Sequence, residues 1–158
     1  MRDPDLFDGV YEGPVGWLGI CLQGEKLCEL AWIARPRRAL RQRHAHSVLR
    51  QIIRCLDSYF ATASFHKIPA LAPAGTKFQQ CVWRALLQIP CGSVKTYGQL
   101  AAELKTGNRA VGQACRRNPI AILIPCHRVV SAGDMGGYMG KTGHLYIKRW
   151  LLEHENVC

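Results

Sequence analysis

Residues 97–117 read YGQLAAELKTGNRAVGQACRR, and this stretch decides the fold of the second half of the chain. Residues 97–104 and 108–117 are each predicted to form a short helix. Thr106 and Gly107 break the helical pattern between them. Two short helices joined by a tight turn are typical of a helix-turn-helix, in which the second helix is the recognition helix.

The flanking residues extend this motif into a domain. Thr76 is a predicted helix cap, and the helix after it places Val82, Leu86 and Ile89 on one face. Residues 131–137 are rich in glycine and predict a flexible wing, and a last helix is expected over about 144–155. We therefore predict a mainly α winged helix-turn-helix domain over residues 73–158.

The first part of the chain has a different pattern. Two apolar segments, 15–21 and 27–33, flank the polar residues 23–26, which predicts a β-hairpin. Apolar residues at helical spacing over 46–61 predict a helix that packs on the hairpin. Residues 64–74, with Pro69 and Pro73, are interpreted as a linker. This pattern predicts a small α/β domain, including the linker, over residues 1–72.

Composition and charge limit the partners. The 158 residues are 48% hydrophobic and 20% charged, and the formal net charge is +10, which favours a polyanionic partner such as DNA, RNA or an anionic membrane. No apolar run reaches the length of a membrane span, and the first residues lack the apolar region of a signal peptide. We therefore expect no membrane partner and a cytoplasmic location. The basic run 35–43 could contact phosphates, but a solvated loop is the favoured interpretation.

Eight cysteines in a reducing compartment are expected to be thiols. A zinc site built from Cys21, Cys28, His44 and His46 is conceivable, but these spacings match no structural zinc pattern. We expect neither a metal nor another cofactor.

Residues 124–130, IPCHRVV, carry the chemistry. They place the thiol of Cys126 beside the imidazole of His127, directly after the apolar run 121–124, which we interpret as a buried strand. Pro125 disfavours a helical conformation at Ile124, so an extended segment is expected. A thiol is nucleophilic as the thiolate, which a nearby histidine promotes. The alternative is a cysteine buried in the core for packing alone.

Several further motifs occur in a fixed order around this segment: residues 96–101 (TYGQLA), 108–112 (NRAVG), Asn118-Pro119, Gly137-Tyr138 and 150–155 (WLLEHE). With IPCHRVV, they resemble the O6-alkylguanine-DNA alkyltransferases, also called methylated-DNA-protein-cysteine methyltransferases. The resemblance covers about residues 75–155 and is faint before residue 70. It implies a ribonuclease H-like sheet and helix ahead of the winged helix-turn-helix.

The resemblance implies repair by a single, irreversible transfer of an alkyl group to Cys126. The donor would be O6-alkylguanine, or O4-alkylthymine, flipped out of duplex DNA through the minor groove. His127 would be the base, acting through a bridging water, with Glu155 behind it. Direct contact between Cys126 and His127 is not expected, because neighbours in an extended segment point to opposite sides. We expect a monomer, with cooperative binding to DNA left open, located at the nucleoid in a prokaryote or in the nucleus in a eukaryote.

Roles for other residues follow from the same resemblance. Tyr97 would donate a hydrogen bond to the departing guanine, Asn118 would brace the turn next to Cys126, and Arg109 would fill the gap left by the flipped base. The rest of the DNA-contacting surface of this helix would consist of Ala110, Val111, Gly112 and Ala114. The substrate pocket would be formed by Pro125, Val129, Tyr138 and Met139.

Three departures from the family pattern stand out. Gln23 occupies a position where some relatives have a zinc-binding cysteine. The segment 139–144 is longer than in familiar members, with Met139 where a smaller residue is common, and Ala121 stands where some relatives have proline. Because of the departures at 139–144 and at Ala121, the sequence does not determine how wide the substrate pocket is.

Two other functional classes remain as alternatives. A winged-helix regulator, or a lesion sensor that flips damaged bases without repairing them, would need no reactive cysteine. A thiol hydrolase would need a histidine distant in sequence and an oxyanion hole. Repair is favoured because Cys126, His127, Tyr97 and Glu155 are all present.

Overall fold

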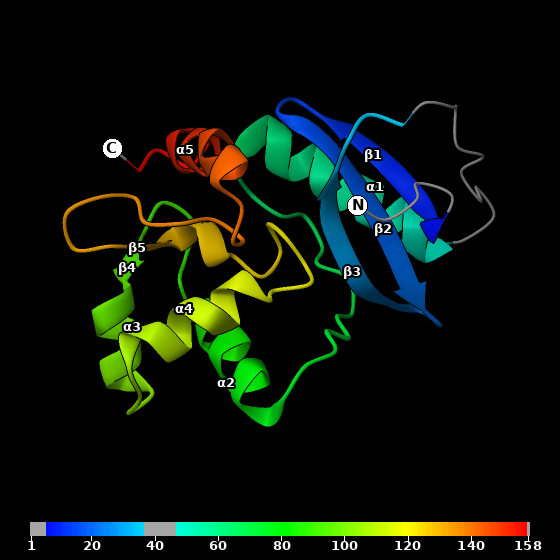
Figure 1. Ribbon diagram of the computed structural model, residues 1–158. Coiled ribbons are helices and arrows are strands. Elements are labelled where there is room, and N and C mark those ends of the chain that lie inside the picture. The colour runs from blue at the N-terminus through cyan, green and yellow to red at the C-terminus, as the bar shows by residue number, and fades with distance from the viewer. Residues whose placement is uncertain (1–5, 37–46, 158) are drawn as a thin grey trace. The chain divides into compact units, whose positions relative to one another are not determined.

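The structure is a computed structural model that describes residues 6–36 and 47–157. The chain divides into two compact units, each of which folds around its own core. The first comprises Met1–Ala74 with Pro119–Ala121, and the second comprises Gly75–Asn118 with Ile122–Cys158 (Figure 1).

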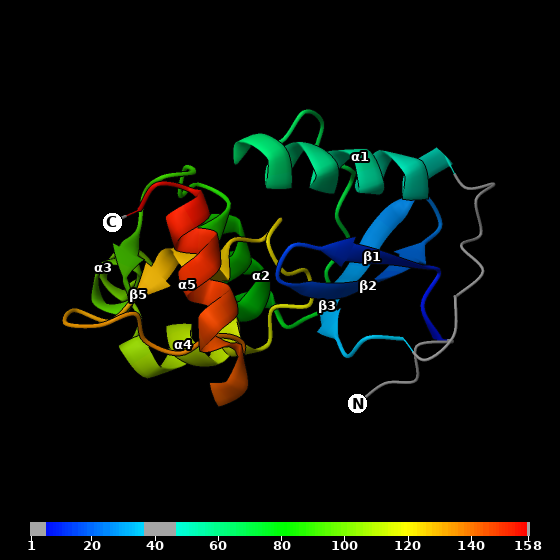
Figure 2. The same ribbon diagram turned by 90° about the horizontal axis from the view of Figure 1, so that it is seen from above.

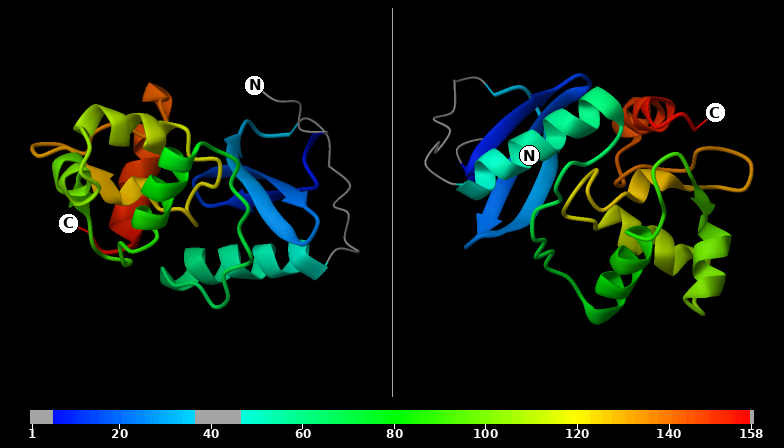
Figure 3. Two further views of the ribbon diagram at one scale, coloured as in Figure 1. Left: turned by 90° about the horizontal axis from the view of Figure 1, so that it is seen from below. Right: turned by 180° about the vertical axis from the view of Figure 1, so that it is seen from behind.

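Over residues 6–36 and 47–74, the first unit forms an antiparallel sheet with one α-helix. The strands β1 (Gly9–Gly13), β2 (Gly16–Gln23) and β3 (Lys26–Ile33) pair in the order β1-β2-β3. The helix α1 (Ser47–Thr62) lies along one face of this sheet, as Figures 2 and 3 show. Its apolar face supplies Leu49, Ile52 and Leu56 to the core. The predicted hairpin and helix are thus present, whereas β1 was not predicted.

Two other segments extend the first unit along β3. Leu27 forms a parallel bridge with Leu71, and Leu30 forms one with Ile120. The amide of Ala121 donates to the carbonyl of Leu30 at 2.8 Å. The end of the predicted linker therefore pairs with the sheet of the first unit.

The second unit consists of four α-helices and a short two-stranded sheet in the described residues. The helices are α2 (Lys77–Leu86), α3 (Tyr97–Glu103), α4 (Asn108–Arg116) and α5 (Leu145–His154). Strand β4 (Lys95–Thr96) pairs in parallel with β5 (Val129–Val130). The threonines that precede α2 and α3, Thr76 and Thr96, each form a capping box with a glutamine three residues later. The helices predicted over 97–104 and 108–117 are present as α3 and α4.

Local backbone geometry around the reactive cysteine differs from the prediction. Residues 121–124 form a buried turn, and Ile122 has a φ of 67°, which a β-strand does not allow. Cys126–Arg128 is a turn of 3-10 helix, so Cys126 and His127 are not extended neighbours. The prediction of a strand at 121–124 and of an extended segment at Cys126 is therefore wrong. An apolar run of this length is compatible with any buried backbone, which is why the sequence did not distinguish them.

Among the described residues, no helix combines the length and the apolar character needed to cross a membrane.

Candidate active site

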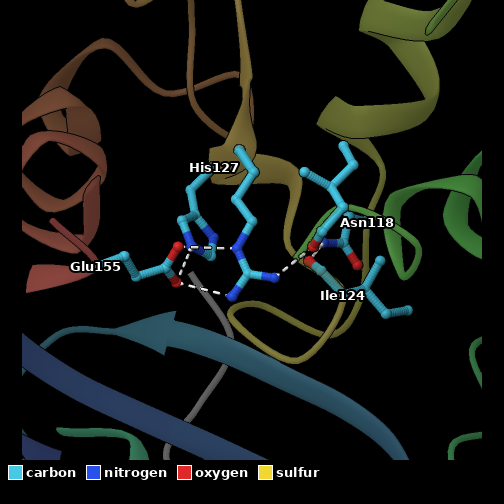
Figure 4. Close-up of polar contacts among 6 residues, drawn as sticks. Asn118, Ile124, His127 and Glu155 are labelled. Carbon is cyan, nitrogen blue, oxygen red and sulfur yellow. Dashed lines mark hydrogen bonds and ion pairs between the residues drawn. The ribbon is translucent and has the colours of Figure 1, made fainter. Parts of the chain in front are cut away.

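Cys126 lies at the start of the 3-10 turn that connects the buried turn 121–124 to β5. It is 3% exposed and reaches a cavity of about 300 Å³. The side-chain amide of Asn118 donates to the carbonyl of Ile124 at 2.7 Å (Figure 4). It also forms a hydrogen bond with the thiol of Cys126. One buried amide thus holds the backbone before the cysteine and lowers the pKa of its thiol.

His127, in the same 3-10 turn, forms a buried pair with Glu155. The imidazole Nε2 lies 2.8 Å from Oε1 of Glu155, and both side chains are fully buried (Figure 4). Glu155 directly follows α5 and caps its carboxyl end. The carboxylate therefore fixes the orientation of the imidazole ring.

Arg128 binds the same carboxylate and was missed by the sequence analysis. Its Nε and Nη2 atoms donate to the two oxygens of Glu155 at 2.8 and 2.9 Å. Its Nη1 donates to the carbonyl of Ile89, just beyond α2, at 2.7 Å. This arginine thus links the end of α2, the cysteine turn and the end of α5.

The charges around His127 favour the neutral imidazole. Burial lowers the pKa of His127, and the positive charges of Arg128 and Lys148 lower it further, while Glu155 opposes them. Within the described part of the chain, Nδ1 of this ring is buried without a hydrogen-bond partner. A neutral, oriented imidazole is the form that can accept a proton.

Two opposing effects act on the thiol of Cys126. Burial raises its pKa, whereas the hydrogen bond from Asn118 and the positive charge of Lys148 lower it. Cys115 on α4 lies in the same cavity, and burial raises the pKa of that thiol as well. Both thiols are therefore protonated at neutral pH in the free protein, and Cys126 has the groups that stabilise its thiolate.

Lys148 is a fully buried lysine that the sequence analysis also missed. Its ammonium group donates to the carbonyls of Val129 and Gly137 at 2.6 and 2.9 Å. Burial lowers its pKa to about 8. The signal in the sequence was its position on the apolar face of α5, between Ile147 and Leu151.

Tyr97, the first residue of α3, lines the cavity and lies near this lysine. Its ring centroid is 6.0 Å from the Lys148 ammonium group, and its hydroxyl lies 3.5 Å from the carbonyl of Gly137. Burial raises the pKa of Tyr97 to about 12. The hydroxyl therefore remains a hydrogen-bond donor at neutral pH.

The residues of α4 divide between two faces. Arg109 is exposed and Gly112 lines the cavity that contains Cys126, and an added methyl group at Gly112 would meet open space. Ala110 is partly exposed. Val111 and Ala114 are 0% and 2% exposed, so they belong to the core and not to the exposed face.

The predicted pocket residues lie at two turns: Pro125 and Val129 flank the cysteine turn, and Tyr138 and Met139 belong to a turn over residues 138–141. Met139 lines the cavity, with a positive φ of 49°. Pro125, Val129 and Tyr138 are buried. Pro125 directly precedes Cys126, Tyr138 directly precedes Met139, and the carbonyl of Val129 accepts the hydrogen bond from Lys148. In the described part of the chain, no group of three metal-binding side chains was found, and the candidate zinc ligands His44 and His46 lie outside that part.

Comparisons with known proteins agree with one another. Residues 77–157 match the family described as "6-O-methylguanine DNA methyltransferase, DNA binding domain". A methylated-DNA–protein-cysteine methyltransferase of Methanosarcina acetivorans is 45% identical over 97% of this chain and 100% of its own length.

Solved structures extend the likeness to the whole fold. The crystal structure of the Mycobacterium tuberculosis O6-methylguanine methyltransferase is 34% identical, with a TM-score of 0.78 over 92% of this chain and 90% of that one. The Mycobacterium tuberculosis protein OGT in complex with DNA is 36% identical, with a TM-score of 0.77 over 93% and 91% of the two chains. With a family model that covers about half of the chain and a relative that spans nearly all of it, this protein belongs to the methylated-DNA–protein-cysteine methyltransferase family.

Proposed function

We propose that this protein repairs alkylated DNA by transferring the alkyl group directly to Cys126. The observation that supports this most strongly is the buried thiol in an open cavity, next to an imidazole that a buried carboxylate orients. The donor is O6-alkylguanine, or O4-alkylthymine, in double-stranded DNA. The protein acts as a monomer and reacts once.

The chemical step is a displacement at the alkyl carbon. The bond from this carbon to the sulfur of Cys126 forms while its bond to the base oxygen breaks. The thiol proton passes through a bridging water to His127, whose imidazolium is stabilised by the Glu155 carboxylate 2.8 Å away. The product is a thioether, which water does not cleave, so the protein is not regenerated.

Three further groups stabilise the charges that develop in this step. The Asn118 amide and the Lys148 ammonium group stabilise the thiolate, since both lower the pKa of Cys126. Negative charge on the departing guanine is stabilised by a hydrogen bond from the Tyr97 hydroxyl, which stays protonated at neutral pH. The same residues would retain these roles for an alkylated thymine.

Base flipping is required because the alkylated oxygen is inaccessible inside the stacked duplex. In our proposal α3 and α4 form the helix-turn-helix, with residues 131–137 as its wing, and α4 enters the minor groove. Gly112 and Ala110 allow close approach to a groove only about 6 Å wide. The exposed Arg109 fills the space that the base leaves. We assign the first unit, with its three-stranded sheet and α1, to the ribonuclease H-like class.

A stoichiometry experiment tests this proposal. Increasing amounts of a duplex with one O6-methylguanine are incubated with a fixed amount of protein until the reaction ends. We expect one lesion removed per protein molecule, and one methyl group on the protein by intact-mass analysis. A lesion sensor would remove none, and a hydrolase would turn over repeatedly; either result would refute the proposal.

A further inference from the structure

The mouth of the Cys126 cavity lies between α4 and a tight turn over residues 138–141, which we call the lip turn. The amide of Lys141 donates to the carbonyl of Tyr138 at 3.1 Å, and the two central residues, Met139 and Gly140, have φ angles of 49° and 68°. A turn with positive φ at both central residues is tightly closed. Met139 and Gly140 both line the cavity.

The base of the lip turn is firmly held. Tyr138 is 2% exposed, and the carbonyl of Gly137 accepts a hydrogen bond from Lys148 at 2.9 Å. The lip turn therefore starts from a fixed point in the second unit. The position of its outer part, at Met139 and Gly140, sets how wide the cavity opens toward α4.

Arg116, the last residue of α4, bridges this opening. A Cβ built on Gly140 would lie 2.6 Å from Cγ and 2.8 Å from Cδ of Arg116, and would also collide with Nε. These distances leave no space between the arginine stem and the backbone of Gly140. Arg116 is itself exposed and lines the cavity together with Cys126. The aliphatic stem of Arg116 thus extends from the end of α4 to the backbone of Gly140 in the lip turn.

We propose that the aliphatic stem of Arg116 limits the size of the alkyl group that can reach Cys126. A methyl group occupies little space beside the sulfur, whereas a benzyl group needs room between α4 and the lip turn, where the stem lies. This inference rests on the proposed alkyl transfer and adds a determinant of substrate size to it.

The test compares two duplexes of the same sequence, one with O6-methylguanine and one with O6-benzylguanine. For each protein variant, the rate constant for thioether formation is measured with both duplexes by intact mass under single-turnover conditions. The ratio of the benzyl rate to the methyl rate is the readout. Contributions of Arg116 to DNA binding cancel in this ratio, because both duplexes present the same backbone.

Two control variants separate the stem from the charge. The test variant, Arg116→Ala, removes both the stem and the charge. The first control, Arg116→Met, keeps an unbranched aliphatic stem without the charge. The second control, Arg117→Ala, removes the charge of a neighbouring exposed residue that does not line the cavity. We expect the ratio to rise on the order of tenfold in Arg116→Ala, the scale on which a pocket discriminates between alkyl groups. In Arg116→Met and Arg117→Ala it should stay close to that of the unmodified protein.

An unchanged ratio in Arg116→Ala would overturn the inference, and so would an equal rise in Arg117→Ala or Arg116→Met. Arg116→Ser provides a second truncation if the alanine variant does not fold. Failure of the proposed function gives a different result, because the unmodified protein would then form no thioether with the methylated duplex.

Discussion

Cys126 is buried, and the proton it must lose has a defined acceptor. His127 is oriented by Glu155, yet burial and the positive charges of Arg128 and Lys148 lower its pKa below the ordinary value of 6.5. The imidazole is therefore neutral, and able to accept a proton, at pH values where an exposed histidine would already be charged.

The pH dependence of alkyl transfer follows from this shift. Going from pH 8 toward acid, we expect the rate to fall through a midpoint below 6.5, because the rate is lost only when His127 becomes protonated. Single-turnover rates on a methylated duplex across this range measure the midpoint. A midpoint at or above 6.5 would contradict the account.

The same lowered pKa has a consequence for stability. Between the folded pKa of His127 and 6.5, the unfolded chain binds a proton that the folded protein excludes. The contribution of His127 to the free energy of unfolding therefore decreases as the pH falls through that window. Above it the contribution is fully present.

At the scale of secondary-structure elements, Arg128 connects three parts of the second unit. It makes two hydrogen bonds to Glu155 at the end of α5 and one to the carbonyl of Ile89 beyond α2. Its side chain is only 6% exposed. A buried ion pair of this kind is costly to break, because the partner is left as an uncompensated charge.

We expect Arg128→Ala to lower the free energy of unfolding by about 3–5 kcal/mol. Arg117→Ala, which removes an exposed arginine at the end of α4, is the matched control and should change it by less than about 0.5 kcal/mol. Urea unfolding of both variants measures the difference. Equal effects of the two substitutions would show that the buried hydrogen bonds of Arg128 do not stabilise the fold more than an exposed arginine does.

A separate prediction concerns the recognition helix α4. Arg109 is exposed at its first turn, and base flipping is needed for duplex DNA but not for a free base. Arg109→Ala should therefore slow alkyl transfer from duplex DNA more than transfer from free O6-alkylguanine. Arg84→Ala, an exposed arginine on α2, is the control and should affect neither. Equal losses of Arg109→Ala on duplex and free base would contradict the assigned role.

At the scale of the whole molecule, local signals in the sequence predicted most of the second unit. The cap at Thr76 predicted α2, and the break at Thr106-Gly107 predicted the division between α3 and α4, because caps and turns are decided by neighbouring residues. The turn at 121–124 was mistaken for a strand, since the positive φ of Ile122 depends on packing around it.

Long-range contacts explain what the sequence did not reveal at the site. Arg128 and Lys148 are polar residues whose partners are distant in sequence: Glu155 and Ile89 for the arginine, and Val129 and Gly137 for the lysine. The approach of Arg116 to Gly140 depends in the same way on how α4 meets the lip turn. Only the folded unit brings these groups together.

The central claim is that the sulfur of Cys126 accepts the alkyl group, and replacing it with oxygen tests this directly. Cys126→Ser and the unmodified protein are incubated in excess with a duplex containing one O6-methylguanine, and the remaining lesion is quantified. We predict complete removal by the unmodified protein and no removal by Cys126→Ser. Loss of the methyl group from DNA incubated with Cys126→Ser would contradict the account.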